Sequence, residues 1–264
     1  MSAAETLERR AFGALEFIDD LTDARVLAPL RIAAPGVHLL RNRSGFYVIR
    51  EVDAKDAYTR AFDDPPANPA RTAFLLSVED PQQRYLAQRF TLELPRLLGT
   101  PGAPVADADN ALRPVQLRLS PAAASPLRAA WAVLRLKVVV TGSKPEVGLA
   151  NVLVEATPQP AGLAMQRTMT DRHGEALVVI ASAPPILPDA GPAGLTREFK
   201  VALSLVLDPE VVRPGTDTTV PLPDPQAVLR RRDAAAAGVK VVLASEQLLS
   251  AGASRRRVEE VTWP

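Results

Sequence analysis

The chain contains no cysteine, so it can form neither a disulfide nor a thiolate site. Aromatic residues make up only 5% of the sequence, and the hydrophobic cores must therefore be built from aliphatic side chains. A surface that binds single-stranded nucleic acid by stacking is not expected, because such surfaces depend on exposed aromatic rings. The sequence has two histidines, His38 and His173, and with no cysteine this leaves too few ligands for a zinc site.

Neither sign of charge dominates, and no long hydrophobic run is present. The 31 basic and 30 acidic side chains give a net charge of +1, so the chain as a whole has no strong electrostatic attraction to nucleic acid or to an anionic membrane. No stretch approaches the roughly 20 apolar residues needed to cross a bilayer. Residues 1–11 are polar and lack the apolar segment of a signal peptide. We therefore expect a cytoplasmic protein without a membrane span or a nucleic-acid partner; release as part of a particle is compatible with this.

What the chain has in abundance is proline and alternating hydrophobic segments. The 25 prolines and 14 glycines favour many short strands over long helices. Residues 132–140 and 199–207 alternate over long runs, which is typical of half-buried strands, and we expect these two strands to pair. Asp224 and Pro225 predict the start of a short helix over 226–237 that Gly238 ends. Further strands are predicted over 15–18, 29–32, 37–40, 46–49, 74–78, 90–94, 115–119, 151–154, 175–180, 239–244 and 258–263.

One pattern occurs twice: a strand, a turn, a second strand, and then an Asx-x-x-Gly turn that opens a third strand. The first copy ends in Asn42-Arg43-Ser44-Gly45, and the second in Asp171-Arg172-His173-Gly174. In such a turn the Asx side chain accepts a backbone hydrogen bond, and the glycine permits the following change of direction. The repetition predicts two related modules in tandem.

The second copy resembles the carboxypeptidase-regulatory-like, or transthyretin-like, β-sandwich family. The residues that carry the resemblance fit an Ala-x-Val-x-Val stretch and a Thr-Asp-x-x-Gly turn; they are Ala150, Val152 and Val154, then Thr170, Asp171 and Gly174. The match spans roughly residues 134–182. After Ile180 the family often continues with a Gly-Tyr turn, whereas this chain has Ala183-Pro184-Pro185.

The resulting prediction is an all-β protein of two tandem Ig-like or transthyretin-like antiparallel β-sandwich domains, with a short helix near the C-terminus. We assign an N-terminal tail to residues 1–12, the first sandwich to 13–98, a Pro/Gly linker to 99–112 and the second sandwich to 113–264.

No catalytic, cofactor-binding or metal-binding residues are predicted, and we expect that the protein is not an enzyme. The sequence has no G-x-S-x-G, P-loop or G-x-G-x-x-G motif. Asp19-Asp20 and Asp63-Asp64 are adjacent carboxylates, and because neighbours on a strand point to opposite faces, they are poorly placed to share one site. A calcium-binding loop at Asp63-Asp64 is the alternative for that pair.

The residues predicted to bind a partner are Arg255, Arg256, Arg257 and Trp263, at the C-terminal end of the chain. Arginine and tryptophan are enriched at interface centres. The alternative for Trp263 is that its ring packs back on its own module. Glu259 and Glu260 follow the arginines, which disfavours nucleic acid as the partner.

We expect a structural or adaptor protein that contacts other proteins of a multi-subunit assembly, with homo-oligomers included. Residues 42–49, 80–86 and 94–96 resemble proteins encoded with phage-tail-like contractile injection particles, which implies a component of such a particle. The alternative is a carbohydrate- or small-ligand-binding sandwich module.

Overall fold

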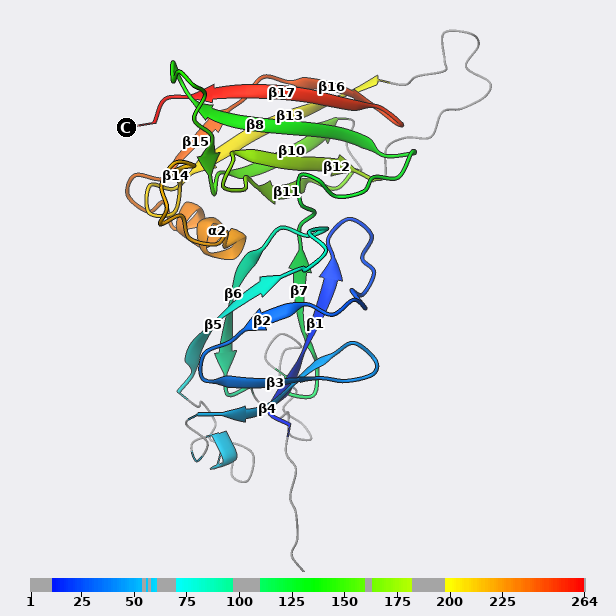
Figure 1. Cartoon of the computed structure of the whole chain (residues 1–264), viewed down its shortest axis with the longest axis vertical. Coiled ribbons are helices and arrows are strands. Elements are labelled where there is room, and N and C mark those ends of the chain that lie inside the picture. The colour runs from blue at the N-terminus through cyan, green and yellow to red at the C-terminus, as the bar shows by residue number, and fades with distance from the viewer. Residues whose placement is uncertain are drawn as a thin grey trace, which may run out of the picture. The chain divides into compact units, whose positions relative to one another are not determined.

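The chain folds as an all-β protein, as the sequence predicts, and it forms two compact units (Figure 1). A computed structural model describes residues 11–53, 56, 58–60, 70–96, 110–159, 163–181 and 198–263. The first unit comprises residues 1–19, 23–78 and 89–118, and the second comprises 20–22, 79–88 and 119–264. Residues 1–10 of the predicted tail, most of the predicted linker and the Asp63-Asp64 pair lie outside the described residues. Phe12, which the prediction placed in the tail, is buried in the first unit and donates its N–H to the Ile49 carbonyl.

The described residues of the first unit form two sheets. Their strands are β1 (Gly13–Asp19), β2 (Arg31–Ala33), β3 (Val37–Arg41), β4 (Tyr47–Val52), β5 (Thr72–Glu79), β6 (Gln88–Leu94) and β7 (Val115–Leu119). One sheet has the order β3-β4-β1-β7 and the other β2-β5-β6. Their buried side chains include Leu15, Phe17, Ile49, Leu76 and Leu94, each at most 1% exposed.

The second unit also contains two main sheets, together with a short ribbon and a helix. Its elements are β8 (Ala132–Val140), β9 (Leu149–Ala150), β10 (Leu153–Gln159), β11 (Gln166–Met169), β12 (Glu175–Ile180), β13 (Glu198–Leu207), β14 (Arg213–Pro214), α2 (Pro225–Asp233), β15 (Lys240–Leu243), β16 (Gln247–Ser250) and β17 (Ser254–Val261). One sheet has the order β12-β8-β17. The other has the order β11-β10-β13-β15, and β16 also pairs with β13.

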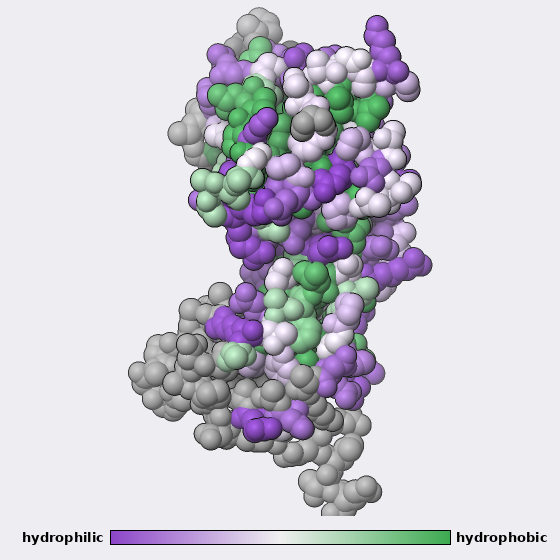
Figure 2. Space-filling view, turned by 90° about the vertical axis from the view of Figure 1, so that its left-hand side faces the viewer, coloured by the Kyte–Doolittle hydropathy of each residue, from purple (hydrophilic) through white to green (hydrophobic). Residues whose placement is uncertain are grey.

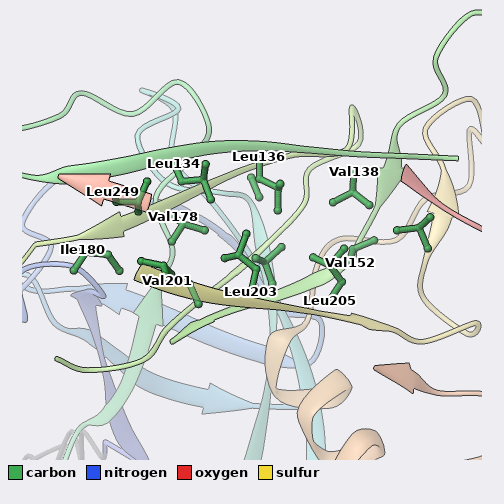
Figure 3. Close-up of a cluster of buried hydrophobic side chains, with 14 of the residues drawn as sticks. Leu134, Leu136, Val138, Val152, Val178, Ile180, Val201, Leu203, Leu205 and Leu249 are labelled. Carbon is green, nitrogen blue, oxygen red and sulfur yellow. The ribbon is translucent and has the colours of Figure 1, made fainter. Parts of the chain in front are cut away.

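The two long alternating strands do not pair, and this prediction was wrong. Strand β13 pairs with β10, β15 and β16, whereas β8 pairs with β12 and β17. Figure 3 shows why both strands alternate: Leu134 and Leu136 of β8 point toward Leu203 of β13 across one hydrophobic core. Alternation reports that one face of a strand is buried, but it does not reveal whether the buried partner is a neighbour in the sheet or a facing sheet.

The predicted antiparallel arrangement also needs a correction, because β17 runs parallel to β8 over its whole length, from Ser254 opposite Val133 to Val261 opposite Val140. The strand that follows the Asx turn, β12, pairs antiparallel with β8 on the other side. The first unit has the same order: β4 pairs antiparallel with β1, and β7 lies on the other side of β1 and points in the same direction (Figure 1).

The predicted second domain, 113–264, begins with a strand that lies elsewhere in the structure. Val115–Leu119 has the predicted bounds, but as β7 it extends the sheet of β1 in the first unit. Residues 79–88, which the prediction placed in the first domain, belong to the second unit. A strand that completes a sheet can follow a long connecting segment in the sequence. Composition alone therefore misplaces the boundary between the two domains.

Two further clusters cover the outer faces of the second unit's sheets. Helix α2 contributes Val228 to a cluster with Leu153, Met169 and Val206, on the outside of the sheet of β10 and β13. On the other sheet, Val133, Leu177 and Val179 are buried beneath Leu21, Leu127 and Trp131. Within the described parts of the chain, no helix is both long and apolar enough to cross a membrane.

Candidate interaction surface

The arginine run predicted to bind a partner lies within strand β17. The sequence predicted this strand to begin at Val258, but it begins at Ser254 and so includes Arg255, Arg256 and Arg257. Strand β17 is the end strand of its sheet, with β8 on one side and no described strand on the other. An end strand is accessible along one side, and charged residues are common on such strands because they prevent unwanted pairing with other strands.

Side chains of β17 alternate between two environments. Val261 packs into the core, which fixes the inward direction for the odd-numbered residues. On this side, the Arg255 guanidinium pairs with Glu198 of β13 at 2.7 Å, and Arg257 donates a hydrogen bond to the Ser245 hydroxyl at 3.0 Å. Arg257 also pairs with Glu259 at 2.9 Å. The Arg255–Glu198 pair therefore joins the two sheets, and Arg257 contacts the segment between β15 and β16.

The even-numbered residues lie on the outer face, and Arg256 is the arginine that stays accessible there. Neither Arg256 nor Glu260 makes a side-chain hydrogen bond or an ion pair with any residue that the structure describes. Val258, between them, is 45% exposed. The predicted arginine cluster is therefore divided: all three side chains are exposed, but Arg255 and Arg257 form ion pairs on the inner side, whereas Arg256 lies on the outer face without a described partner.

A shallow hollow of about 360 Å³ lies on the same outer face, between β12, β8 and β17. Its basic groups are Arg135, Lys137 and Arg256, with Arg257 at its margin, and its acidic groups are Glu146 and Glu175. Lys137 pairs with Glu146 at 3.0 Å, and Arg135 donates to the Ala123 carbonyl. No aromatic residue lines the hollow, so it offers no ring on which a sugar could stack. Sequence reasoning missed the hollow because its residues come from three separate strands and two loops.

Trp263 does not join the arginines in one exposed patch. Its ring is half-buried and packs against the main core of the second unit. This position agrees with the alternative interpretation, in which Trp263 packs back on its own module.

Exposed hydrophobic residues occur in both units, and in the second unit several of them lie on strands β15, β16 and β17. Leu243 of β15 is 84% exposed, Val241 is 52% exposed, and Leu248 of β16 is 42% exposed. Figure 2 shows hydrophobic residues in green beside hydrophilic ones in purple on the surface of this unit. Both sheets of the second unit therefore end in strands that carry exposed apolar side chains.

The repeated Asx-x-x-Gly turn has a structural role in both units. Asp171 Oδ1 accepts hydrogen bonds from the backbone N–H groups of His173 at 2.7 Å and Glu175 at 3.0 Å. Asn42 Oδ1 accepts one from Phe46 at 2.9 Å, the position equivalent to Glu175. In both turns the glycine has a positive φ, +87° at Gly45 and +76° at Gly174.

The threonine before the second turn explains the Thr-Asp-x-x-Gly pattern. Thr170 is fully buried, and its hydroxyl donates to the Leu149 carbonyl at 2.6 Å and accepts from the Val152 N–H at 2.9 Å. These bonds hold the bend at Asn151, whose side chain donates to the carbonyls of Val211 and Pro221. The motif is thus a corner of the fold, and His173 at its tip is exposed.

The groups with shifted pKa values are ion-paired and serve the fold. Burial raises the pKa of the Glu155 carboxyl, but hydrogen bonds from Arg232 and Arg167 outweigh burial and hold the pKa below its usual value of 4.5. Asp80 behaves in the same way: burial is outweighed by Arg84 and by two backbone N–H groups, which lower its pKa. Among the described residues, no group of three acidic or histidine side chains is arranged to hold a metal ion.

The chain matches no family model, no curated protein and no solved structure. Its function is therefore inferred from the geometry of the molecule and from its sequence.

Proposed function

We propose that this protein is a non-enzymatic structural or adaptor component that acts through protein–protein contacts in a larger assembly. The observation that carries the proposal is strand β17, an end strand with no described strand along one side and with Arg256 and Val258 exposed. An end strand of this kind is a template for another strand, and backbone hydrogen bonds supply affinity while side chains supply specificity.

We further propose that both units are β-sandwiches of the Ig-like or transthyretin-like kind. Three features support the second unit's assignment: two sheets that face one core, the buried Thr170 at the corner, and the Asp171 turn before β12. For the first unit, the support is the shared sheet order β4-β1-β7 and the equivalent turn at Asn42. The contractile injection particle is proposed as the assembly from the sequence resemblance alone.

The proposal can be tested by site-specific cross-linking in the cell that makes the protein. A photo-reactive amino acid at position 256 should give discrete covalent adducts with other subunits, identified by mass spectrometry. The same group at position 172, at the exposed tip of the Asp171 turn, serves as the control and should give few adducts. A chain that is purified free of other proteins and forms no adduct from position 256 would contradict the proposal.

A further inference from the structure

The backbone of β17 presents a defined set of hydrogen-bonding groups to its free side. Val133 N–H donates to the Ala253 carbonyl, and Thr141 N–H donates to the Val261 carbonyl, so the odd-numbered carbonyls of this segment point toward β8. The register between β8 and β17 is continuous from Ser254 to Val261. Because successive backbone groups of a strand point to opposite sides, the N–H and C=O groups of the even-numbered residues point away from β8.

The sequence of β17 has a charge pattern in which positive residues precede Val258 and negative residues follow it. From position 256 the sequence reads Arg-Arg-Val-Glu-Glu, two positive residues and two negative residues around Val258. An antiparallel copy centred on Val258 places Arg256 opposite Glu260 and Arg257 opposite Glu259, and the two Val258 side chains meet. Arg256, Val258 and Glu260 all belong to the set whose backbone groups point outward, so the Arg256–Glu260 and Val258–Val258 pairs are also those that can exchange backbone hydrogen bonds.

We propose that two copies of this chain pair through β17, antiparallel and about a two-fold axis at Val258, so that the sheet β12-β8-β17 continues into its copy. This inference rests on the proposed function, because it names the partner of the same strand. The pairing forms about six backbone hydrogen bonds, two from each of three outward-facing pairs. It covers Val258, which is 45% exposed in the single chain. It also gives Arg256 and Glu260 partners that no described residue provides.

The charge pattern selects this register over its neighbours. A shift that centres the pair on Arg256 or on Arg257 places two arginines directly opposite each other, and a shift to Glu259 or Glu260 does the same with two glutamates. Like charges directly opposite each other destabilise a strand pair. A charged end strand also resists pairing with strands of arbitrary sequence, so the pattern favours a second copy over other segments.

The test is a charge exchange read by sedimentation equilibrium. Arg256→Glu should weaken self-association by about tenfold or more, since it creates two Glu–Glu contacts per dimer. Glu260→Arg should weaken it similarly, because it creates two Arg–Arg contacts. The double variant Arg256→Glu/Glu260→Arg should restore the dimer. An equimolar mixture of the two single variants should form a heterodimer more tightly than either variant associates with itself.

Two further variants separate loss of pairing from loss of folding. Arg172→Glu changes the same charge at an exposed turn outside β17 and should leave self-association unchanged. Val258→Pro removes an N–H that points away from β8, so it should abolish the dimer while the far-UV circular dichroism spectrum is retained. A dimer that is indifferent to Arg256→Glu and Val258→Pro overturns the inference.

The outcomes also distinguish this inference from the proposed function. A wild-type chain that remains monomeric at its highest soluble concentration, yet forms adducts with other subunits from position 256, overturns only the homodimer. A monomer without adducts overturns both.

Discussion

At the scale of single residues, three glycines determine how closely the backbone can pack at one corner of the second unit. A Cβ atom on Gly148 would overlap the His173 carbonyl, one on Gly174 would overlap the Val138 carbonyl, and one on Gly215 would overlap the Arg172 carbonyl. Gly174 also has a positive φ of +76°. The glycine of the Asx-x-x-Gly turn is therefore required for packing as well as for conformation.

We expect Gly174→Ala to lower the free energy of unfolding by about 3 kcal/mol or more, because overlap with backbone atoms adds to the conformational cost. The matched control is Gly142→Ala. Gly142 has a similar φ of +72°, but a Cβ atom there would have no heavy atom within 4 Å. That variant should lose only about 1 kcal/mol. Urea denaturation followed by tryptophan fluorescence measures both, since Trp131 and Trp263 lie in the second unit. An equal loss of unfolding free energy in the two variants would contradict the argument that close backbone packing at Gly174 adds to the cost.

At the scale of elements, helix α2 is attached to its sheet by ion pairs as well as by Val228. Asp224 caps the helix as predicted, with its side chain accepting from Ala227 N–H at 2.8 Å. The helix ends at Asp233, earlier than the predicted 237. Arg232 pairs with Glu155 of β10 at 2.6 Å, and Arg231 pairs with the fully buried Asp208 at 2.6 Å. Arg231 and Arg232 thus help to attach the helix to the rest of the second unit.

The Glu155 contact predicts a pH dependence of stability. Because its pKa is lowered in the folded state, Glu155 stabilises the fold fully above its unfolded pKa of about 4.5, and this stabilisation is lost as the pH falls through the folded pKa. Glu155→Gln should cost about 1–3 kcal/mol at neutral pH and less at acidic pH, measured by urea denaturation at several pH values. Glu146→Gln, in an exposed pair with Lys137, is the control and should cost well under about 1 kcal/mol. A cost for Glu155→Gln that does not change with pH would contradict the assignment.

At the scale of the whole molecule, the two units repeat one sheet order. In each, the first strand lies between the strand that follows the Asx turn and the last strand of the unit, β4-β1-β7 and β12-β8-β17. They differ in the strand before the turn, because β3 pairs with β4 whereas β11 pairs with β10. The repeat seen in the sequence is thus a repeat of topology, with one strand exchanged between sheets.

The position of β7 can be checked in the full-length chain. Leu117 is 9% exposed and lies on β7, which pairs with β1. We expect Leu117→Ala to cost about 2–4 kcal/mol and to accelerate amide hydrogen exchange in β1 and β4. Faster exchange confined to β8 and β12 would instead assign this strand to the second domain, as the sequence predicted.

The sequence alone determined the local structure of this protein. Alternating residues predicted β8 and β13 almost to their ends, and Asp224-Pro225 predicted the start of α2. The Asx-x-x-Gly pattern predicted both turns, since hydrogen bonds within four residues depend on nearby side chains. Trp263 was predicted as an interface residue with burial as the alternative, because composition cannot separate an exposed ring from a buried one.

Only the tertiary structure decided which strands become neighbours. Pairing of β8 with β17, and of β1 with β7, joins segments about a hundred residues or more apart, and no local pattern encodes such a choice. The same pairing decided that Arg255 and Arg257 would lie on the side of the second sheet while Arg256 lies on the outer face. Three identical residues acquired different roles because a strand directs successive side chains to opposite faces.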